Sequence, residues 1–213
     1  MALISQWDKQ GNLIDTINIA ATDGVPTGIT TDRKYLWVLG TGNTTTYQFD
    51  KQGNLIDSWA LAVATDFTGD ITTDRKYLWV VDVINTTINQ YDKQGNLIFS
   101  FATTYPPFGI TTDRKYLWVV GLDEVAGAYL MQYDKQGNLI DTIDITPVIG
   151  ETTPTGITTD RKYLWIANVE NALVYQFDKQ GNLIDSWACL PGGEIPTGIT
   201  TDRKYLWITS IED

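Results

Sequence analysis

Short runs of apolar and β-branched residues alternate with polar turn residues along the whole chain. In runs such as Tyr35 to Gly40 and Asn54 to Ala60, the residues Ile, Thr, Tyr, Trp and Val predominate, while Gly, Asn and Asp mark the joins between runs. Runs of about four to seven residues with this composition are typical of β-strands. The pattern predicts an all-β protein, and we expect no helix.

Two stretches recur five times without change and alternate along the chain. The stretch ITTDRKYLW begins at Ile29, Ile71, Ile110, Ile157 and Ile199. The stretch DKQGNLI begins at Asp8, Asp50, Asp92, Asp134 and Asp178. Each repeat of roughly 42 residues holds four predicted strands, and a four-stranded meander repeated at this period is typical of the blades of a β-propeller.

Both recurring stretches contain a predicted turn. Asp50 to Asn54 fits a type I turn in which Asp50 caps the first position and Gly53 supplies a positive φ. Asp32 to Tyr35 lies between the first two strands, where Asp32 can cap the turn through its side chain. We therefore expect antiparallel hairpins at both places in every repeat.

The two ends of the chain complete each other. Residues 1–20 match the third and fourth strands of a repeat, and residues 198–213 match the first and second. One blade shared between the ends would close the ring and leave no unpaired edge at a seam. We predict one domain over residues 1–213, a five-bladed β-propeller of four-stranded antiparallel blades.

The pattern PTGITTD, YLWV, YQFD, KQG, NLID within each repeat resembles the blades of NHL-type and related bacterial propellers. The near-identity of the copies is similar to that of highly repetitive bacterial propellers. The resemblance covers the whole chain and implies a ring with a binding face. It does not identify a ligand.

Composition excludes several kinds of site and partner. The chain has no histidine and one cysteine, Cys189, so zinc clusters, disulfides and histidine bases are absent. The net charge of −11 would repel nucleic acid, and no apolar run is long enough to span a membrane. We expect neither a nucleic-acid nor a membrane partner, and we expect a monomer.

The variable segments follow the second and fourth strands of each repeat, so they should lie on one face of the ring, which we call the diversified face. All 15 basic residues belong to the recurring stretches, whereas twelve of the 26 acids lie in variable segments or at their edges. A negative diversified face favours cationic or polyhydroxyl ligands. The alternative is that the acids only maintain solubility and that the loops vary because they tolerate change.

Candidate ligand-binding residues on the diversified face are aromatic, amide and acidic. They are Asn43, Asp70, Asp82, Asn85, Tyr105, Phe108, Asp123, Glu124 and Glu170. Aromatic rings beside such groups could stack on sugars or anchor a peptide. Their alternative role is to fill gaps between blades.

Asp70 and Asp82 depart together from the repeat. Asp70 stands where the other four copies have glycine, and Asp82 stands where they have Gly40, Gly121, Asn168 and Ser210. The hairpin would bring them roughly opposite one another near the mouth of the ring. Two carboxylates at that separation repel unless one binds a proton or a cation lies between them, and calcium suits oxygen ligands. We therefore consider a Ca²⁺ site formed by Asp70 and Asp82, with two solvated acids as the alternative.

No nucleophile and base pair or phosphate-binding loop is present, and small blades leave little room for inserted catalytic loops. The sequence therefore predicts that the chain is not an enzyme but a recognition module for a carbohydrate or a protein or peptide ligand on the diversified acidic face. Two alternatives stay open. They are a carboxylate-dependent glycoside hydrolase and a ligand-free structural or artificial scaffold.

Overall fold

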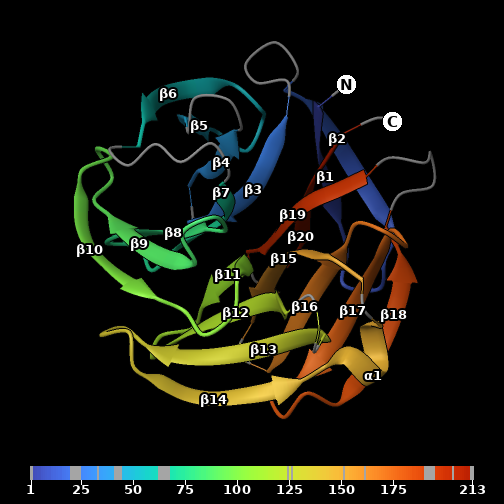
Figure 1. The fold of residues 1–213 in the computed structure, drawn as a ribbon. Helices are drawn as coiled ribbons and strands as arrows, with labels where there is room; N and C mark the ends of the chain where they lie inside the picture. The colour runs from blue at the N-terminus through green and yellow to red at the C-terminus, as the bar shows by residue number, and fades with distance from the viewer. Residues whose placement is uncertain are drawn as a thin grey trace.

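A computed structural model describes residues 2–19, 25–32, 34–40, 45–61, 68–123, 125, 127–150, 152–160, 162–189, 195–202 and 204–211. Its strands form five four-stranded antiparallel sheets placed around a central axis (Figure 1). The prediction of a five-bladed, all-β propeller is confirmed.

Each blade runs outward from an innermost strand. Blade 1 consists of β3 (Pro26–Thr31), β4 (Leu36–Gly40), β5 (Thr45–Phe49) and β6 (Leu55–Ala60). Blade 2 consists of β7 (Thr68–Thr73), β8 (Leu78–Asp82), β9 (Thr87–Tyr91) and β10 (Leu97–Ala102). Blade 3 consists of β11 (Pro107–Thr112), β12 (Tyr116–Asp123), β13 (Gly127–Asp134) and β14 (Leu139–Asp144). Blade 4 consists of β15 (Pro154–Thr159), β16 (Tyr163–Asn168), β17 (Leu173–Asp178) and β18 (Leu183–Ala188).

Blade 5 is shared between the two ends of the chain, as predicted. Its order is β19 (Ile195–Thr201), β20 (Leu206–Ile211), β1 (Ala2–Trp7) and β2 (Leu13–Asn18), and the two termini lie side by side in Figure 1. Strand β1 pairs with β20 from Ala2 opposite Ile211 to Trp7 opposite Leu206. The last strand of the chain thus has a partner along its full length.

A short helix corrects the expectation of a helix-free chain. The helix α1 (Thr146–Ile149) follows β14 and places Pro147 in its first turn, where a missing N–H costs nothing. The N–H of Gly150 donates to the carbonyl of Thr146, and Ile149 is buried against blades 3 and 4. Strand composition predicts only the repeated part of each blade, and this helix lies in a connection. Among the described residues, no helix is long and apolar enough to cross a membrane.

The core lies between the blades. Each apolar cluster combines residues of two consecutive blades, as when Trp37 and Leu39 of blade 1 pack with Ile71 and Tyr91 of blade 2. The recurring tryptophan of ITTDRKYLW is at most 4% exposed in all five copies. Burial of this kind is the main favourable term in folding, so adjacent blades stabilise one another.

The two invariant stretches meet at every boundary between blades. The lysine of DKQ in one blade forms an ion pair with the aspartate of DRK in the preceding blade. The Nζ to Oδ2 distances are 2.7 Å for Lys9 and Asp160, 3.1 Å for Lys51 and Asp202, 3.0 Å for Lys93 and Asp32, 2.8 Å for Lys135 and Asp74, and 2.7 Å for Lys179 and Asp113. These five pairs follow one another around the whole ring.

Two features of the structure require glycine at the last position of DKQG. Gly53 has a φ of 87°, and its N–H donates to the carbonyl of Asp50, as the predicted turn requires. A Cβ added at Gly53 would also collide with Cγ2 of Ile17 on the outer strand of the preceding blade. At Gly11 and Gly95 the corresponding neighbours are Trp187 and Trp59, so these two tryptophans pack against the turn of the following blade.

Gly53→Ala and Gly150→Ala separate these two features. Gly150 has a φ of 75°, but a Cβ there would find its nearest atom 3.8 Å away. We expect Gly150→Ala to lower the free energy of unfolding by about 1 kcal/mol through backbone strain. Gly53→Ala should cost about 1–3 kcal/mol more, because the outer strand of blade 5 must move. Urea unfolding midpoints measure both, and equal costs would contradict the packing role.

Candidate functional site

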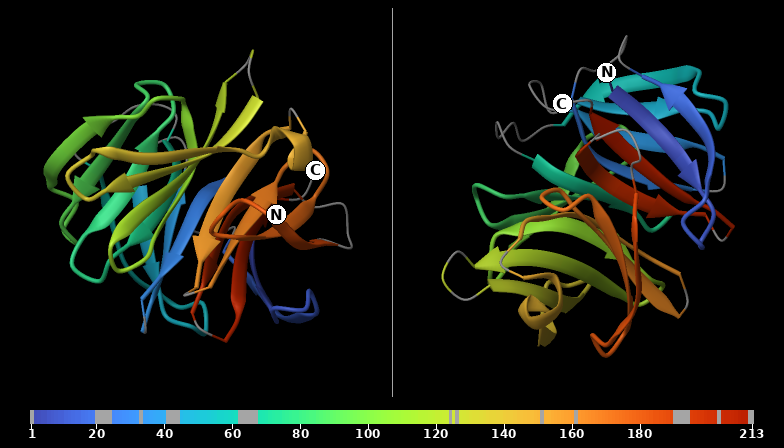
Figure 2. Two further views of the ribbon diagram at one scale, coloured as in Figure 1. Left: turned by 90° about the horizontal axis from the view of Figure 1, so that it is seen from below. Right: turned by 90° about the vertical axis from the view of Figure 1, so that its right-hand side faces the viewer.

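The diversified face carries loops of unequal reach. The hairpin of β12 and β13 is the longest, with eight residues in each strand, and it projects beyond the neighbouring blades in the left view of Figure 2. Val125 lies at its tip and is 95% exposed. This hairpin brings Asp123 to the same end of blade 3 as Tyr129.

A pair of tyrosines stacks on this face. The rings of Tyr105 and Tyr129 stack with centroids 4.5 Å apart and an angle of 17° between their planes. Both side chains are half-buried, and Tyr105 also packs against the cluster between blades 2 and 3. Partial burial and then the nearby Tyr105, Asp144 and Asp123 raise the pKa of Tyr129. The aromatic pair therefore has carboxylates beside it.

Asp82 holds a turn instead of facing a partner carboxylate. Its Oδ1 accepts the N–H of Asn85 at 2.9 Å, and its Oδ2 accepts Nδ2 of Asn85 at 3.1 Å. Asn168 stands at the same position of blade 4, and its Oδ1 accepts the N–H of Glu170. These residues cap the loop after the second strand of their blades, a role that short polar side chains perform in turns.

Asp70 lies on the axis of the ring and is fully buried, so it is not near an open mouth. Thr68 pairs with Asp82 across the hairpin, and the register shifts between Thr68 and Ile71. The expectation that Asp70 and Asp82 lie opposite one another is therefore wrong, because the register places Ile71 opposite Val80 and Thr68, not Asp70, opposite Asp82. Both carboxylates accept N–H groups of the chain itself, Asp70 at the axis and Asp82 in a turn, and they do not converge on a shared cation site. Within the described residues, no group of three or more acidic or sulfur ligands could hold a metal ion.

The remaining candidates are dispersed. Glu170 is exposed, and its Oε1 accepts the N–H of Thr153 at 3.1 Å, which ties two loops together. Phe108 is half-buried on β11, beside the axis. Asn43 and Glu124 lie outside the described residues. The structure thus brings together Tyr105 and Asp123 through Tyr129, but it does not gather the other candidates around them.

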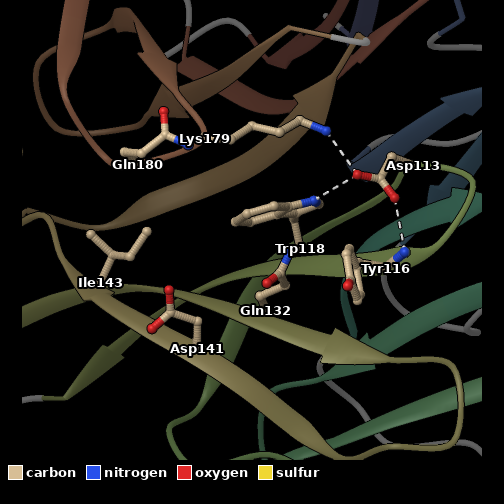
Figure 3. Close-up of a pocket in the computed structure, with 8 residues that line it drawn as sticks. All are labelled: Asp113, Tyr116, Trp118, Gln132, Asp141, Ile143, Lys179 and Gln180. Carbon is tan, nitrogen blue, oxygen red and sulfur yellow. Dashed lines mark hydrogen bonds and ion pairs between the residues drawn. The ribbon is translucent and has the colours of Figure 1, made fainter.

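A groove on the opposite side of blade 3 was missed from the sequence. It encloses about 440 Å³ between blade 3 and the outer turn of blade 4 (Figure 3). Its lining consists of Asp113, Tyr116, Trp118, Gln132, Asp141, Ile143, Lys179 and Gln180. Most of these belong to invariant positions, which sequence reasoning assigned to the framework. The sequence signal that could have indicated the groove is the variation at the position of Ile143, which carries isoleucine in some copies and a bulky aromatic residue in others.

Polar groups of the groove are held in fixed positions. Asp113 accepts Nζ of Lys179 at 2.7 Å, Nε1 of Trp118 at 3.2 Å and the N–H of Tyr116 at 2.8 Å. Burial raises the pKa of the Asp113 carboxyl, but Lys179 and the hydrogen bonds outweigh it and lower the pKa to about 2. Gln132 and Asp141 are cross-strand partners at the outer side of the groove.

Asp113 should contribute stability that depends on pH. Its pKa of about 2 in the folded state lies below the ordinary value of 3.8, so its contribution is present above pH 4 and is lost as the pH falls towards 2. We expect Asp113→Asn and Lys179→Met each to flatten the fall in stability between pH 4 and pH 2.5, measured by urea unfolding. An unchanged slope in both variants would contradict the ion pair.

No protein-family model matches the chain, and no curated protein matches it. Solved structures share its fold. A glutaminyl cyclase from Myxococcus xanthus matches with a TM-score of 0.67 and 8% identity over 88% of this chain and 91% of that chain. A chain in a nidogen/laminin complex matches with a TM-score of 0.65 and 13% identity over 98% and 85%. Virginiamycin B lyase from Staphylococcus aureus matches with a TM-score of 0.57 and 15% identity over 99% and 74%.

These matches correct the prediction that the chain is not an enzyme. That prediction assumed that small blades leave too little room for catalysis. The glutaminyl cyclase and this chain match over nearly all of both, so a ring of similar size accommodates an enzyme. The resemblance to repetitive propellers with NHL-type blades holds at the level of the fold, which serves both enzymes and binding proteins.

Proposed function

We propose that this chain is a recognition module that binds a peptide or protein segment with exposed lysine or arginine at Tyr105 and Tyr129 on the diversified face. The stacked tyrosines beside Asp123 and Asp144 carry this proposal. An alkyl-ammonium or guanidinium group can lie against an aromatic face while a carboxylate accepts its hydrogen bonds.

The distribution of charge supports a basic ligand. All 15 basic residues lie in the recurring turns, and the lysine of each DKQ is engaged in an ion pair with the neighbouring blade. The variable segments supply acids without any basic residue. A surface of one sign raises the association rate of oppositely charged ligands and weakens binding as salt is added.

Binding of a fluorescent oligolysine or oligoarginine peptide tests the proposal. We expect Tyr129→Ala and Asp144→Asn each to weaken binding roughly 5- to 30-fold, which corresponds to about 1–2 kcal/mol. Asp185→Asn is the matched control, because it removes one exposed outer-strand carboxylate of blade 4 away from the tyrosines. Equal effects of Asp144→Asn and Asp185→Asn would mean that only net charge matters, and an unchanged affinity in Tyr129→Ala would refute the site.

A carbohydrate is the second candidate ligand, and the groove of Figure 3 favours it. Gln132, Asp141 and Gln180 provide amide and carboxylate groups that can bond hydroxyls, and Trp118 and Ile143 provide an apolar wall. Sugars are bound by such combinations of polar groups and aromatic surfaces. This groove lies on the face that carries the invariant turns.

The repeats offer a test of the groove. Ile17 occupies the position of Ile143 at the boundary of blades 5 and 1, while Trp59 and Trp187 occupy it elsewhere. We expect a glycan found by array screening to bind with two sites per chain by calorimetry. Replacing Ile17 and Ile143 by Trp should abolish binding without unfolding the ring, since two other blades already carry Trp there. Binding that survives the double variant would exclude the groove.

A further inference from the structure

Five backbone positions meet at the axis of the ring, one from the innermost strand of each blade. Glycine occupies four of them, at positions 28, 109, 156 and 198, and aspartate the fifth, at position 70. A Cβ added at Gly156 would lie 3.0 Å from Cα of Gly198, and one added at Gly198 would lie 2.8 Å from Cα of Gly28. A side chain at these glycine positions would therefore collide with the backbone of the adjacent innermost strand.

The side chain of Asp70 fills this space. A Cβ added at Gly28 would lie 2.6 Å from Oδ1 and 2.7 Å from Cα of Asp70, so the carboxylate lies against the innermost strand of the adjacent blade 1. Asp70 is 0% exposed. One carboxylate thus occupies a space that the backbone of the whole ring encloses.

Backbone N–H groups from four different blades converge on this carboxylate. Oδ1 accepts the N–H of Ile71 at 2.8 Å, and Oδ2 accepts the N–H of Ile110 at 3.1 Å. The N–H groups of Ile157 and Ile29 also act to lower the pKa of Asp70. Convergent amide dipoles of this kind form a concave site that favours negative charge.

Amide groups, and not a cation, surround the buried acid. In the part of the chain that the structure describes, no lysine or arginine forms a salt bridge with Asp70. Burial raises the pKa of Asp70 well above its usual value, while the four amides act in the opposite direction. A buried carboxylate without such donors would cost several kcal/mol, so the amides are what make its position tolerable.

We infer that the axis of the ring is an anion-binding site built from backbone amides, and that Asp70 is a ligand for it that the chain itself supplies. The isoleucine amides belong to the recurring ITTDRKYLW stretch, so every blade has an isoleucine N–H donor at this place. Only blade 2 has a side chain, Asp70, that accepts hydrogen bonds from these donors. Without the Asp70 side chain, the same amides should bind a free small monovalent anion such as chloride, bromide or formate.

Asp70→Gly tests this inference because it makes the five blades alike at the axis and removes the carboxylate without adding atoms. We expect its melting temperature to rise with chloride or formate at constant ionic strength held by sulfate, which is larger and divalent. Once the anion exceeds its dissociation constant, each tenfold increase should raise the melting temperature by about 3–5 °C. The parent protein should show no such dependence, since its site is filled.

Asp70→Asn is the matched control. It keeps the size of the side chain and blocks the axis, but it carries no charge and points an NH₂ group towards N–H donors. We expect it to melt below the parent at every anion concentration and to gain nothing from chloride or formate. A response equal to that of Asp70→Gly would place the anion elsewhere on the molecule and would overturn the inference.

A crystal of Asp70→Gly grown in bromide locates the anion directly. We expect an anomalous peak on the axis within hydrogen-bonding distance of the amides of Ile71 and Ile110. If Asp70→Gly is unfolded in sulfate alone, formate should restore its folding, as followed by tryptophan fluorescence. A variant that melts identically in all these anions, or that no small anion refolds, would refute the site.

Discussion

The contact between the aspartate of one blade's first turn and the lysine of the next blade's last turn is the constraint on which the ring depends. A single exposed ion pair contributes little. Here both side chains of each pair are partly shielded from solvent. In four of the five pairs the lysine also lies over the ring of the recurring tryptophan in the same blade as the aspartate, for example Lys93 over Trp37 at 4.9 Å. The same contact closes the apolar cluster between the blades. Because both partners belong to invariant stretches, the same kind of contact recurs at all five boundaries around the ring.

Equality of the blades has a consequence at the axis. When five identical strands face a common centre, their amides converge there, and five identical carboxylates could not share the space that one occupies. The chain resolves this with glycine in four blades and Asp70 in the fifth. Asp70 is therefore better understood as the counter-charge of the framework than as part of the diversified face. Its environment of N–H donors also explains why a cation site is a poor description of it.

The candidate binding residues differ in how far local sequence could assign them. Asp82 stands where other copies carry Gly, Asn or Ser, and Asn168 at the same position of blade 4 caps the following loop in the same way. Tyr105 was identified from its aromatic character alone. Its partner Tyr129 lies 24 positions further along the chain, in the third strand of blade 3, and only the packing of the connection between blades 2 and 3 stacks the two rings.

The sequence by itself determined the strands, the turns, the number of blades and the closure by both termini, because these depend on local composition and on a repeat that needs no contact information. The sequence predicted a positive φ for the glycine of DKQG. Only the structure showed that a Cβ at this glycine would collide with the preceding blade. The position of Asp70 on the axis, the pairing of Lys179 with Asp113 and the groove around Ile143 were decided by the tertiary structure. Each joins residues of different blades, and the angle between blades is a property of side-chain packing that no single repeat encodes.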